Sequence, residues 1–181
     1  MRNVVLIMTA SLDGLVVGPS GTPVVAHAEP PELKRWKLER IRRAGTHIMG
    51  RETYEGMASF WPTSTDDYAA PMNEIPKVVF SKTLKAATWP ESSIARGDLA
   101  EEIAKLRGQP GGEIIAWGGA RFAQALSKAE LIDEYAIVTL PVAYGSGKPL
   151  FHDLPDALRF NVLAATTYAD GTALHLYEPQ R

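Results

Sequence analysis

The chain contains no cysteine among its 181 residues. That absence excludes disulfides, thiolate nucleophiles and cysteine-ligated metal sites, and it fits a reducing cytoplasm, where we expect the protein to be. Neither sign of charge dominates, because 19 Lys and Arg stand against 21 Asp and Glu. The sequence therefore gives no electrostatic case for a nucleic-acid or membrane partner, and any phosphate must be bound by a local cluster of residues.

Long hydrophobic runs are also missing. The apolar stretch from Val4 to Ala10 is too short to span a membrane, and we interpret it as a core strand rather than a secretory signal. The four histidines have no metal-ligand spacing, so no metal site is expected. The sequence has no Gly-x-Ser-x-Gly nucleophile elbow, and covalent catalysis has no visible candidate.

The pattern of apolar residues predicts one α/β domain over residues 1–181. Strands are expected at 3–10, 46–49, 77–80, 86–89, 92–95, 113–117, 133–140, 159–168 and 172–178. Helices are expected from Pro31 to a stop at Gly45, at 52–59, for about ten residues after Asp98, and at 119–128. Strands and helices alternate until the last two strands. This order predicts a three-layer α/β/α fold, with a mostly parallel mixed sheet and antiparallel C-terminal edge strands.

Two of these strands run into glycine and turn directly into a helix. The first junction is Met49-Gly50-Arg51-Glu52-Thr53, and the second is Trp117-Gly118-Gly119-Ala120-Arg121-Phe122. Glycine lets a ligand approach the backbone closely, and the first amides of a helix favour anions. A third polar segment, Ser81-Lys82-Thr83, ends another strand and would suit a phosphate on the same edge. The alternatives are strand–helix packing for the glycines and an ordinary polar turn for Ser81.

Five segments together resemble the dihydrofolate-reductase-like superfamily, and most closely the C-terminal reductase domain of the bifunctional riboflavin-biosynthesis enzyme. Besides the two glycine junctions, they are Ser11-Leu12-Asp13-Gly14, Val79-Phe80-Ser81-Lys82-Thr83-Leu84 and Gly145-Ser146-Gly147-Lys148-Pro149-Leu150-Phe151. The last of these is not a phosphate loop, because proline follows its lysine. The resemblance implies a homodimeric, NADPH-dependent reductase of a small molecule.

The resemblance also implies roles for individual residues. Those expected at NADPH are Thr9, Ala10, Val17, Gly18, Gly50, Arg51, Thr53, Ser81, Lys82, Thr83, Gly118, Gly119, Ala120, Arg121 and Phe122. Arg51, Ser81 and Lys82 match positions at the adenosine 2′-phosphate, and Gly118–Gly119 matches a peptide that is often cis. Those expected at the substrate are Trp36, Phe60, Trp61 and Thr139; the three aromatics would otherwise be core residues.

The acid that assists protonation is the weakest match. Asp13 and Glu32 are the catalytic candidates, with Glu29 a neighbouring alternative to Glu32. Glu32 would otherwise stabilise the helix dipole, and Asp13 would otherwise be a turn residue beside Gly14. The leading activity is reduction of 5-amino-6-(5-phosphoribosylamino)uracil in riboflavin biosynthesis. The alternatives are dihydrofolate reduction and a non-catalytic, NADPH-binding regulatory dimer.

Overall fold

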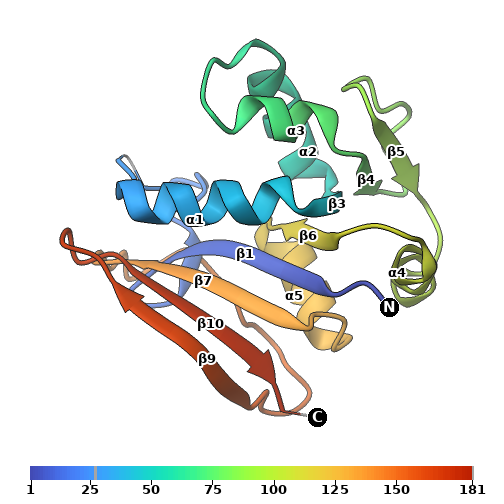
Figure 1. The fold of residues 1–181 in the computed structure, drawn as a ribbon. Helices are drawn as coiled ribbons and strands as arrows, with labels where there is room; N and C mark the ends of the chain where they lie inside the picture. Colours follow the sequence, from blue (N-terminus) through green and yellow to red (C-terminus); the bar gives the residue numbers. More distant parts are fainter. Residues whose placement is uncertain (27, 181) are drawn as a thin grey trace.

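A computed structural model describes residues 1–26 and 28–180, and its framework is one large twisted sheet (Figure 1). His27 and Arg181 lie outside the described residues. The main strands are β1 (Val4–Ser11), β3 (Ala44–Gly50), β4 (Lys77–Phe80), β5 (Ser92–Ala95), β6 (Glu113–Trp117), β7 (Glu134–Leu140), β9 (Phe160–Thr167) and β10 (Ala173–Pro179). They are ordered β5-β4-β3-β6-β1-β7-β10-β9. The first six strands in this order run parallel, and β10 is antiparallel to both β7 and β9.

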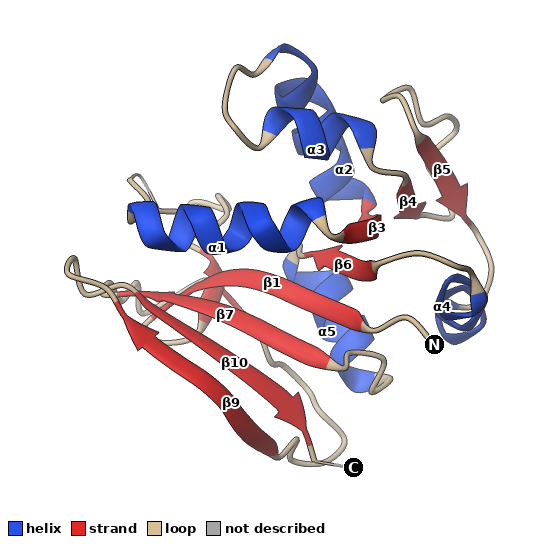
Figure 2. Ribbon diagram, viewed as in Figure 1, coloured by secondary structure: helices blue, strands red, loops and turns tan. Residues whose placement is uncertain are grey.

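Helices cover both faces of the sheet, which confirms the α/β prediction (Figure 2). They are α1 (Pro31–Arg42), α2 (Arg51–Phe60), α3 (Ala69–Glu74), α4 (Leu99–Gly108) and α5 (Ala120–Lys128), with a short 3-10 helix, η1 (Trp61–Thr63). Strand β1 shows why two cores form. Its residues Val5 and Ile7 pack with α1, α2 and α3, whereas Val4 and Leu6 pack with α4 and α5 on the opposite face. Buried strands with two apolar faces are typical of parallel sheets.

Several local predictions were wrong. Helix α1 ends at Arg42 rather than Gly45, which lies in β3. A Cβ atom at Gly45 would lie 2.7 Å from the backbone nitrogen of Gly112, so this glycine serves a close backbone approach. Residues 86–89 form no strand; the amide of Trp89 donates instead to the Tyr54 hydroxyl at 2.9 Å. Residues 61–74, for which the sequence predicted no helix or strand, include η1 and α3.

A two-stranded pair beside the main sheet was also missed. Strand β2 (Leu15–Val17) pairs with β8 (Lys148–Pro149). A Cβ atom at Gly147 would overlap the carbonyl oxygen of Val17, so the Gly-Ser-Gly-Lys segment is shaped for packing against β2. This pair fixes the loop after β1, whose residues Val16 and Val17 face a cleft described below.

Candidate active site

A cavity of about 600 Å³ opens where β3 and β4 end and where α2 and α5 begin. We call it the helix-end cavity. Its lining residues are Gly50, Arg51, Glu52, Thr53, Phe80, Ser81, Lys82, Thr83, Ala95, Arg96, Gly97, Asp98, Leu99, Gly119, Arg121, Phe122 and Ala125. Four of these side chains are cationic: Arg51, Lys82, Arg96 and Arg121. Because β3, β4 and β6 are parallel, their carboxyl ends share the edge where ligands bind in α/β sheets.

Both helices that begin here have a glycine at the N-cap and no side-chain capping bond, Gly50 for α2 and Gly119 for α5. The first amides of a helix have no partner within the helix, so a glycine cap leaves them accessible to an anion. Space is tight at these glycines. A Cβ atom would lie 3.2 Å from Cβ of Phe122 at Gly50, and 2.8 Å from the Thr53 hydroxyl at Gly119.

Hydrogen bonds with Ser81 and with Arg96 stabilise the turn after β4. Ser81 Oγ accepts hydrogen bonds from the amides of Thr83, at 3.2 Å, and Leu84, at 3.0 Å. The Arg96 guanidinium donates to the carbonyl of Leu84 at 2.6 Å and to that of Lys82 at 3.3 Å. Arg51 donates to the Thr83 hydroxyl at 3.1 Å and pairs with Glu55. The cationic side chains of α2 and of this turn therefore gather at one end of the cavity.

A second hollow of about 640 Å³, which we call the aromatic cleft, lies between β1, β2, β6 and helices α1 to α3. Its lining residues are Ile7, Met8, Thr9, Val16, Val17, Pro23, Val24, Val25, Ala26, Glu29, Lys37, Ile41, Glu52, Thr53, Gly56, Met57, Phe60, Trp61, Tyr68, Met72, Trp117, Gly118, Gly119 and Ala120. Glu52, Thr53 and Gly119 line both hollows. A ligand with a phosphate-rich end and a flat ring fits the pair: phosphates at the helix ends, ring in the cleft.

Gly118 lines the aromatic cleft beside Gly119, which lines both hollows. A side chain at this position would overlap the Met8 thioether, and the Thr53 hydroxyl donates to the Gly118 carbonyl. The Gly118–Gly119 peptide is trans, contrary to the form that the resemblance often carries. The Trp117 indole donates to Nδ1 of the buried His47 at 3.0 Å, which fixes the orientation of this cleft wall.

One carboxylate lies within the apolar part of the cleft, and it is Glu29. The Tyr68 hydroxyl donates to Glu29 Oε2 at 2.6 Å, and the Lys37 ammonium pairs with the other oxygen. The side chains of Glu29 and Lys37 are 17% and 15% exposed. Burial, together with the Glu29 bond, raises the pKa of Tyr68, so its phenol stays neutral.

The structure brings thirteen of the fifteen predicted cofactor residues to these two hollows. Ala10 and Gly18 are the exceptions. Ala10 points into the core on the opposite face of β1, and the Gly18 amide donates to Thr22 within a tight loop turn. Of the predicted substrate residues, Phe60 and Trp61 line the aromatic cleft.

Four other predicted site residues are not brought to the cleft. Asp13 accepts hydrogen bonds from the Ser11 hydroxyl at 2.6 Å and from the Gly145 amide at 2.7 Å. These bonds lower the pKa of Asp13 and connect the loop after β1 to the loop before β8. Glu32 is exposed in the first turn of α1. Trp36 packs against the core between the sheet and helices α1 to α3, and the Arg40 guanidinium lies 6.0 Å from the centre of its ring.

The fourth, Thr139, pairs with Ala10 across β1 and β7. It lines a separate cavity of about 370 Å³ on the other face of the sheet, with Phe151, Phe160 and Tyr177. The polar residues that line the two hollows and that sequence reasoning left out include Lys37, Tyr68 and Arg96. Tyr68 lies in a polar segment and Lys37 on a charged helix, so only the fold joins them to Glu29.

A family model, the RibD C-terminal domain, matches residues 2–174. The chain belongs to this family. A curated relative, the uncharacterized protein YyaP of Bacillus subtilis (strain 168), is 24% identical over 182 residues, covering 97% of this chain and 94% of YyaP. A solved structure of a putative riboflavin biosynthesis protein from Shewanella sp. PV-4 covers 99% of this chain and 100% of that one, with 25% identity and a TM-score of 0.83.

Two more distant structures have the same fold as this RibD C-terminal domain. One is the diaminohydroxyphosphoribosylaminopyrimidine deaminase/5-amino-6-(5-phosphoribosylamino)uracil reductase of Thermotoga maritima: TM-score 0.72, 15% identity, 99% of this chain and 57% of that one. The other is the dihydrofolate reductase of Enterococcus faecalis complexed with NADP(H). Its TM-score is 0.66 and its identity 16%, and the match covers 99% of this chain and 97% of that one. The superfamily expected from the five sequence segments is thereby confirmed. No helix among the described residues is long and apolar enough to cross a membrane, and these residues contain no cluster of potential metal ligands.

Proposed function

We propose that this protein is an NADPH-dependent reductase of a small heterocyclic molecule. The observation that carries the proposal is the continuity of two different hollows. One gathers glycine-capped helix ends with Arg51 and Lys82, and the other is apolar and aromatic. The same fold in a dihydrofolate reductase holding NADP(H) supports a nicotinamide cofactor.

When bound, NADPH would supply a hydride for the carbon of a C=O or C=N group, with a proton added at the oxygen or nitrogen. The chain's residues bind and orient. The free amides at the starts of α2 and α5 would hold the pyrophosphate, while Arg51, Ser81 and Lys82 would hold the 2′-phosphate. Gly118 and Gly119 would let the ring lie against the backbone.

Glu29 replaces Asp13 and Glu32 as our candidate for the carboxylate that meets the substrate. It is the one of the three that lines the aromatic cleft. Its two partners, Lys37 and Tyr68, hold it in place. Alignment of bound groups is the main contribution that such a site makes to catalysis.

The sequence resemblance favours 5-amino-6-(5-phosphoribosylamino)uracil as substrate, and the Thermotoga neighbour is named for that reductase. Dihydrofolate is the alternative substrate. A non-catalytic NADPH-binding regulator is the alternative function. We further propose a single domain over 1–181, a cytoplasmic location and assembly as a homodimer.

Cofactor choice tests the proposal directly. We expect NADPH to raise the melting temperature more than NADH does, because only NADPH offers the 2′-phosphate. Arg51→Ala should weaken NADPH binding about tenfold and NADH binding less than about twofold, the size of one charge-assisted hydrogen bond. The affinities are measured by fluorescence titration of the reduced cofactor.

Arg159→Ala is the matched control, since Arg159 is an exposed arginine outside both hollows. It should leave both affinities unchanged. Equal losses of NADPH and NADH binding in Arg51→Ala would refute the role of Arg51. No response of the wild-type protein to either cofactor would refute the proposed function.

A further inference from the structure

Lys77 is a buried charged residue to which the proposed mechanism gives no role. It begins β4 and is 1% exposed. Its ammonium donates to three backbone carbonyls, those of Met72 at 3.1 Å, Asn73 at 2.8 Å and Ile75 at 2.8 Å. Burying an ammonium costs free energy unless hydrogen bonds compensate for it, and here each of its three N–H groups has an acceptor.

The three carbonyls lie at the C-terminal end of α3. The last carbonyls of a helix have no partner within the helix, and a cation beside them is favourable. With six residues, α3 is also too short to be stable without packing. Lys77 therefore satisfies the end of this helix and attaches it to β4.

The Asn73 side chain continues the connection toward the aromatic cleft. Its amide group donates to the carbonyl of Trp61 at 3.0 Å, and its oxygen accepts the Trp89 indole N–H at 2.8 Å. The buried Trp89 ring has its centre 4.5 Å from the Lys77 ammonium, a distance at which a cation is attracted to an aromatic face. We call Lys77, Asn73 and Trp89 the lysine cluster.

The lysine cluster holds one wall of the aromatic cleft. This wall consists of Trp61 in η1, Tyr68 at the N-cap of α3 and Met72 within α3, all of which line the cleft. Residues 61–75, all of which the structure describes, contain no strand that pairs with the main sheet. The position of the wall relative to the sheet therefore depends on side-chain contacts such as those of Lys77.

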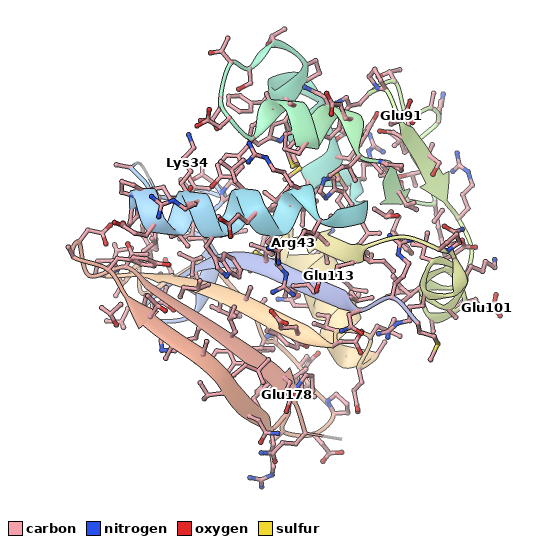
Figure 3. All side chains as sticks on the ribbon, in the orientation of Figure 1. Lys34, Arg43, Glu91, Glu101, Glu113 and Glu178 are labelled. Carbon is pink, nitrogen blue, oxygen red and sulfur yellow. The ribbon has the colours of Figure 1, made fainter. Side chains whose placement is uncertain are left out.

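The charges around Lys77 leave its proton removable. His47, its neighbour across β3 and β4, is neutral, and Glu74 on α3 is exposed. Glu91, labelled in Figure 3 on the connection that precedes β5, favours the charged ammonium. Burial outweighs this attraction and lowers the pKa of Lys77 to about 8. A neutral amine has two N–H groups for the three carbonyls.

We propose that Lys77 is a positioning residue of the substrate cleft, whose ammonium holds the wall of Trp61, Tyr68 and Met72 where a substrate ring would pack. The proposal rests on the proposed reductase function, and it adds a residue that contacts neither cofactor nor substrate. A fixed aromatic wall aligns a flat ring for reaction.

Hydrogen exchange in the free protein tests the positioning role without any ligand. Lys77→Met keeps a long apolar side chain and removes the donors. Exchange at the amides of Met72 and Ile75, which donate one turn back in α3, should become about tenfold faster, whereas exchange at Ala123 in α5 stays as in wild type. Lys105→Met, at an exposed lysine of α4, is the matched control and should change none of them. Equal acceleration at all three amides, or none, would overturn the proposal.

If Lys77→Met does not fold, pH provides the same comparison in wild-type protein. Between pH 7 and pH 9, protection of the Met72 and Ile75 amides should fall about threefold to tenfold relative to that of Ala123, because one carbonyl loses its donor. The midpoint should lie near pH 8, the pKa of Lys77. A constant ratio across this range contradicts the proposal.

Binding of a ring compound measures the effect of the wall on the substrate. Dihydrofolate and 5-amino-6-(5-phosphoribosylamino)uracil are titrated by calorimetry into protein saturated with NADP⁺. The compound that binds wild-type protein should bind Lys77→Met about tenfold more weakly at pH 7, and only wild type should lose affinity with a midpoint near pH 8. Asn73→Ala, which keeps Lys77 but frees Trp61, should weaken binding about threefold and retain the midpoint.

NADPH affinity separates this proposal from the proposed function. It should be equal in Lys77→Met and wild type, because Lys77 lines neither hollow. A wild-type protein that binds no NADPH refutes the reductase function, and the exchange experiment then decides the role of Lys77 by itself. Loss of NADPH binding in Lys77→Met, or unchanged affinity for the ring compound, would overturn the positioning role.

Discussion

At the scale of single residues, burial and hydrogen bonds fix the orientation of side chains that line the site. The clearest example is His47, which is fully buried in β3 and accepts the Trp117 indole N–H through Nδ1. Burial, and the nearby Lys77 ammonium, lower the pKa of His47 to about 3. The imidazole is therefore neutral under physiological conditions, and it orients Trp117 without taking part in proton transfer.

This burial predicts a dependence of stability on pH. The unfolded chain protonates His47 near pH 6.5, whereas the folded protein does so only near pH 3. The stabilising effect of a neutral His47 is therefore complete above about pH 6.5 and is lost as the pH falls toward 3. The slope of the unfolding free energy should reach about 1.4 kcal/mol per pH unit in this window.

Denaturant unfolding at several pH values from 7 to 4 tests this slope. Asparagine at position 47 cannot titrate, and it keeps an acceptor near the position of Nδ1. His47→Asn should therefore lower stability at pH 7 but show a shallower fall with acid than wild type. Parallel pH profiles for the two proteins would contradict the prediction, because the carboxylates that also titrate are common to both.

At the scale of elements, the sequence predicted the positions of strand–helix junctions better than the loops between them. Gly50 and Gly119 were recognisable because an apolar run stops at glycine and a helix follows. The contribution of Arg96 was not recognisable. It follows β5 by one residue, yet its guanidinium bonds backbone carbonyls of the turn after β4. A contact of this kind depends on strand pairing rather than on local pattern.

Arg96 should act on the cofactor through that turn. Arg96→Ala removes the donors to Lys82 and Leu84, and we expect NADPH affinity to fall about threefold to tenfold. Hydrogen exchange at the amides of Thr83 and Leu84 should become faster in the free protein. The reason is that Arg96 no longer stabilises the turn in which these two amides donate to Ser81 Oγ. Unchanged exchange together with weaker binding would mean that Arg96 contacts the cofactor directly.

At the scale of the whole molecule, the C-terminal strands leave one edge of the sheet open. Strand β9 is the last strand beyond β10 and lies away from the helices (Figure 1). Its side chains Val162 and Leu163 are 61% and 50% exposed. Exposed apolar edge strands promote association, so this edge is our candidate for the proposed homodimer interface.

Sedimentation analysis tests this interface. Wild-type protein should sediment at about twice the 19.7 kDa mass of one chain. Leu163→Lys should sediment as a monomer, because a lysine cannot be buried there without a partner. Val25→Lys, at an equally exposed apolar residue that lines the aromatic cleft, should remain dimeric. A monomeric wild-type protein would exclude the dimer.

The amino-acid sequence by itself determined the order of the eight strands of the main sheet along the chain, the two glycine junctions and most of the polar segments that line the helix-end cavity. These features follow from the local spacing of apolar residues and from residues that are neighbours along the chain. The tertiary structure alone decided which polar residues line the aromatic cleft. In the folded protein, Asp13 bonds to the loop before β8, and Thr139 lies on the opposite face of the sheet. Glu29 is bound by Lys37 and Tyr68. The physical reason is that a carboxylate's role depends on what surrounds it in space, and these partners come from elements that only packing brings together.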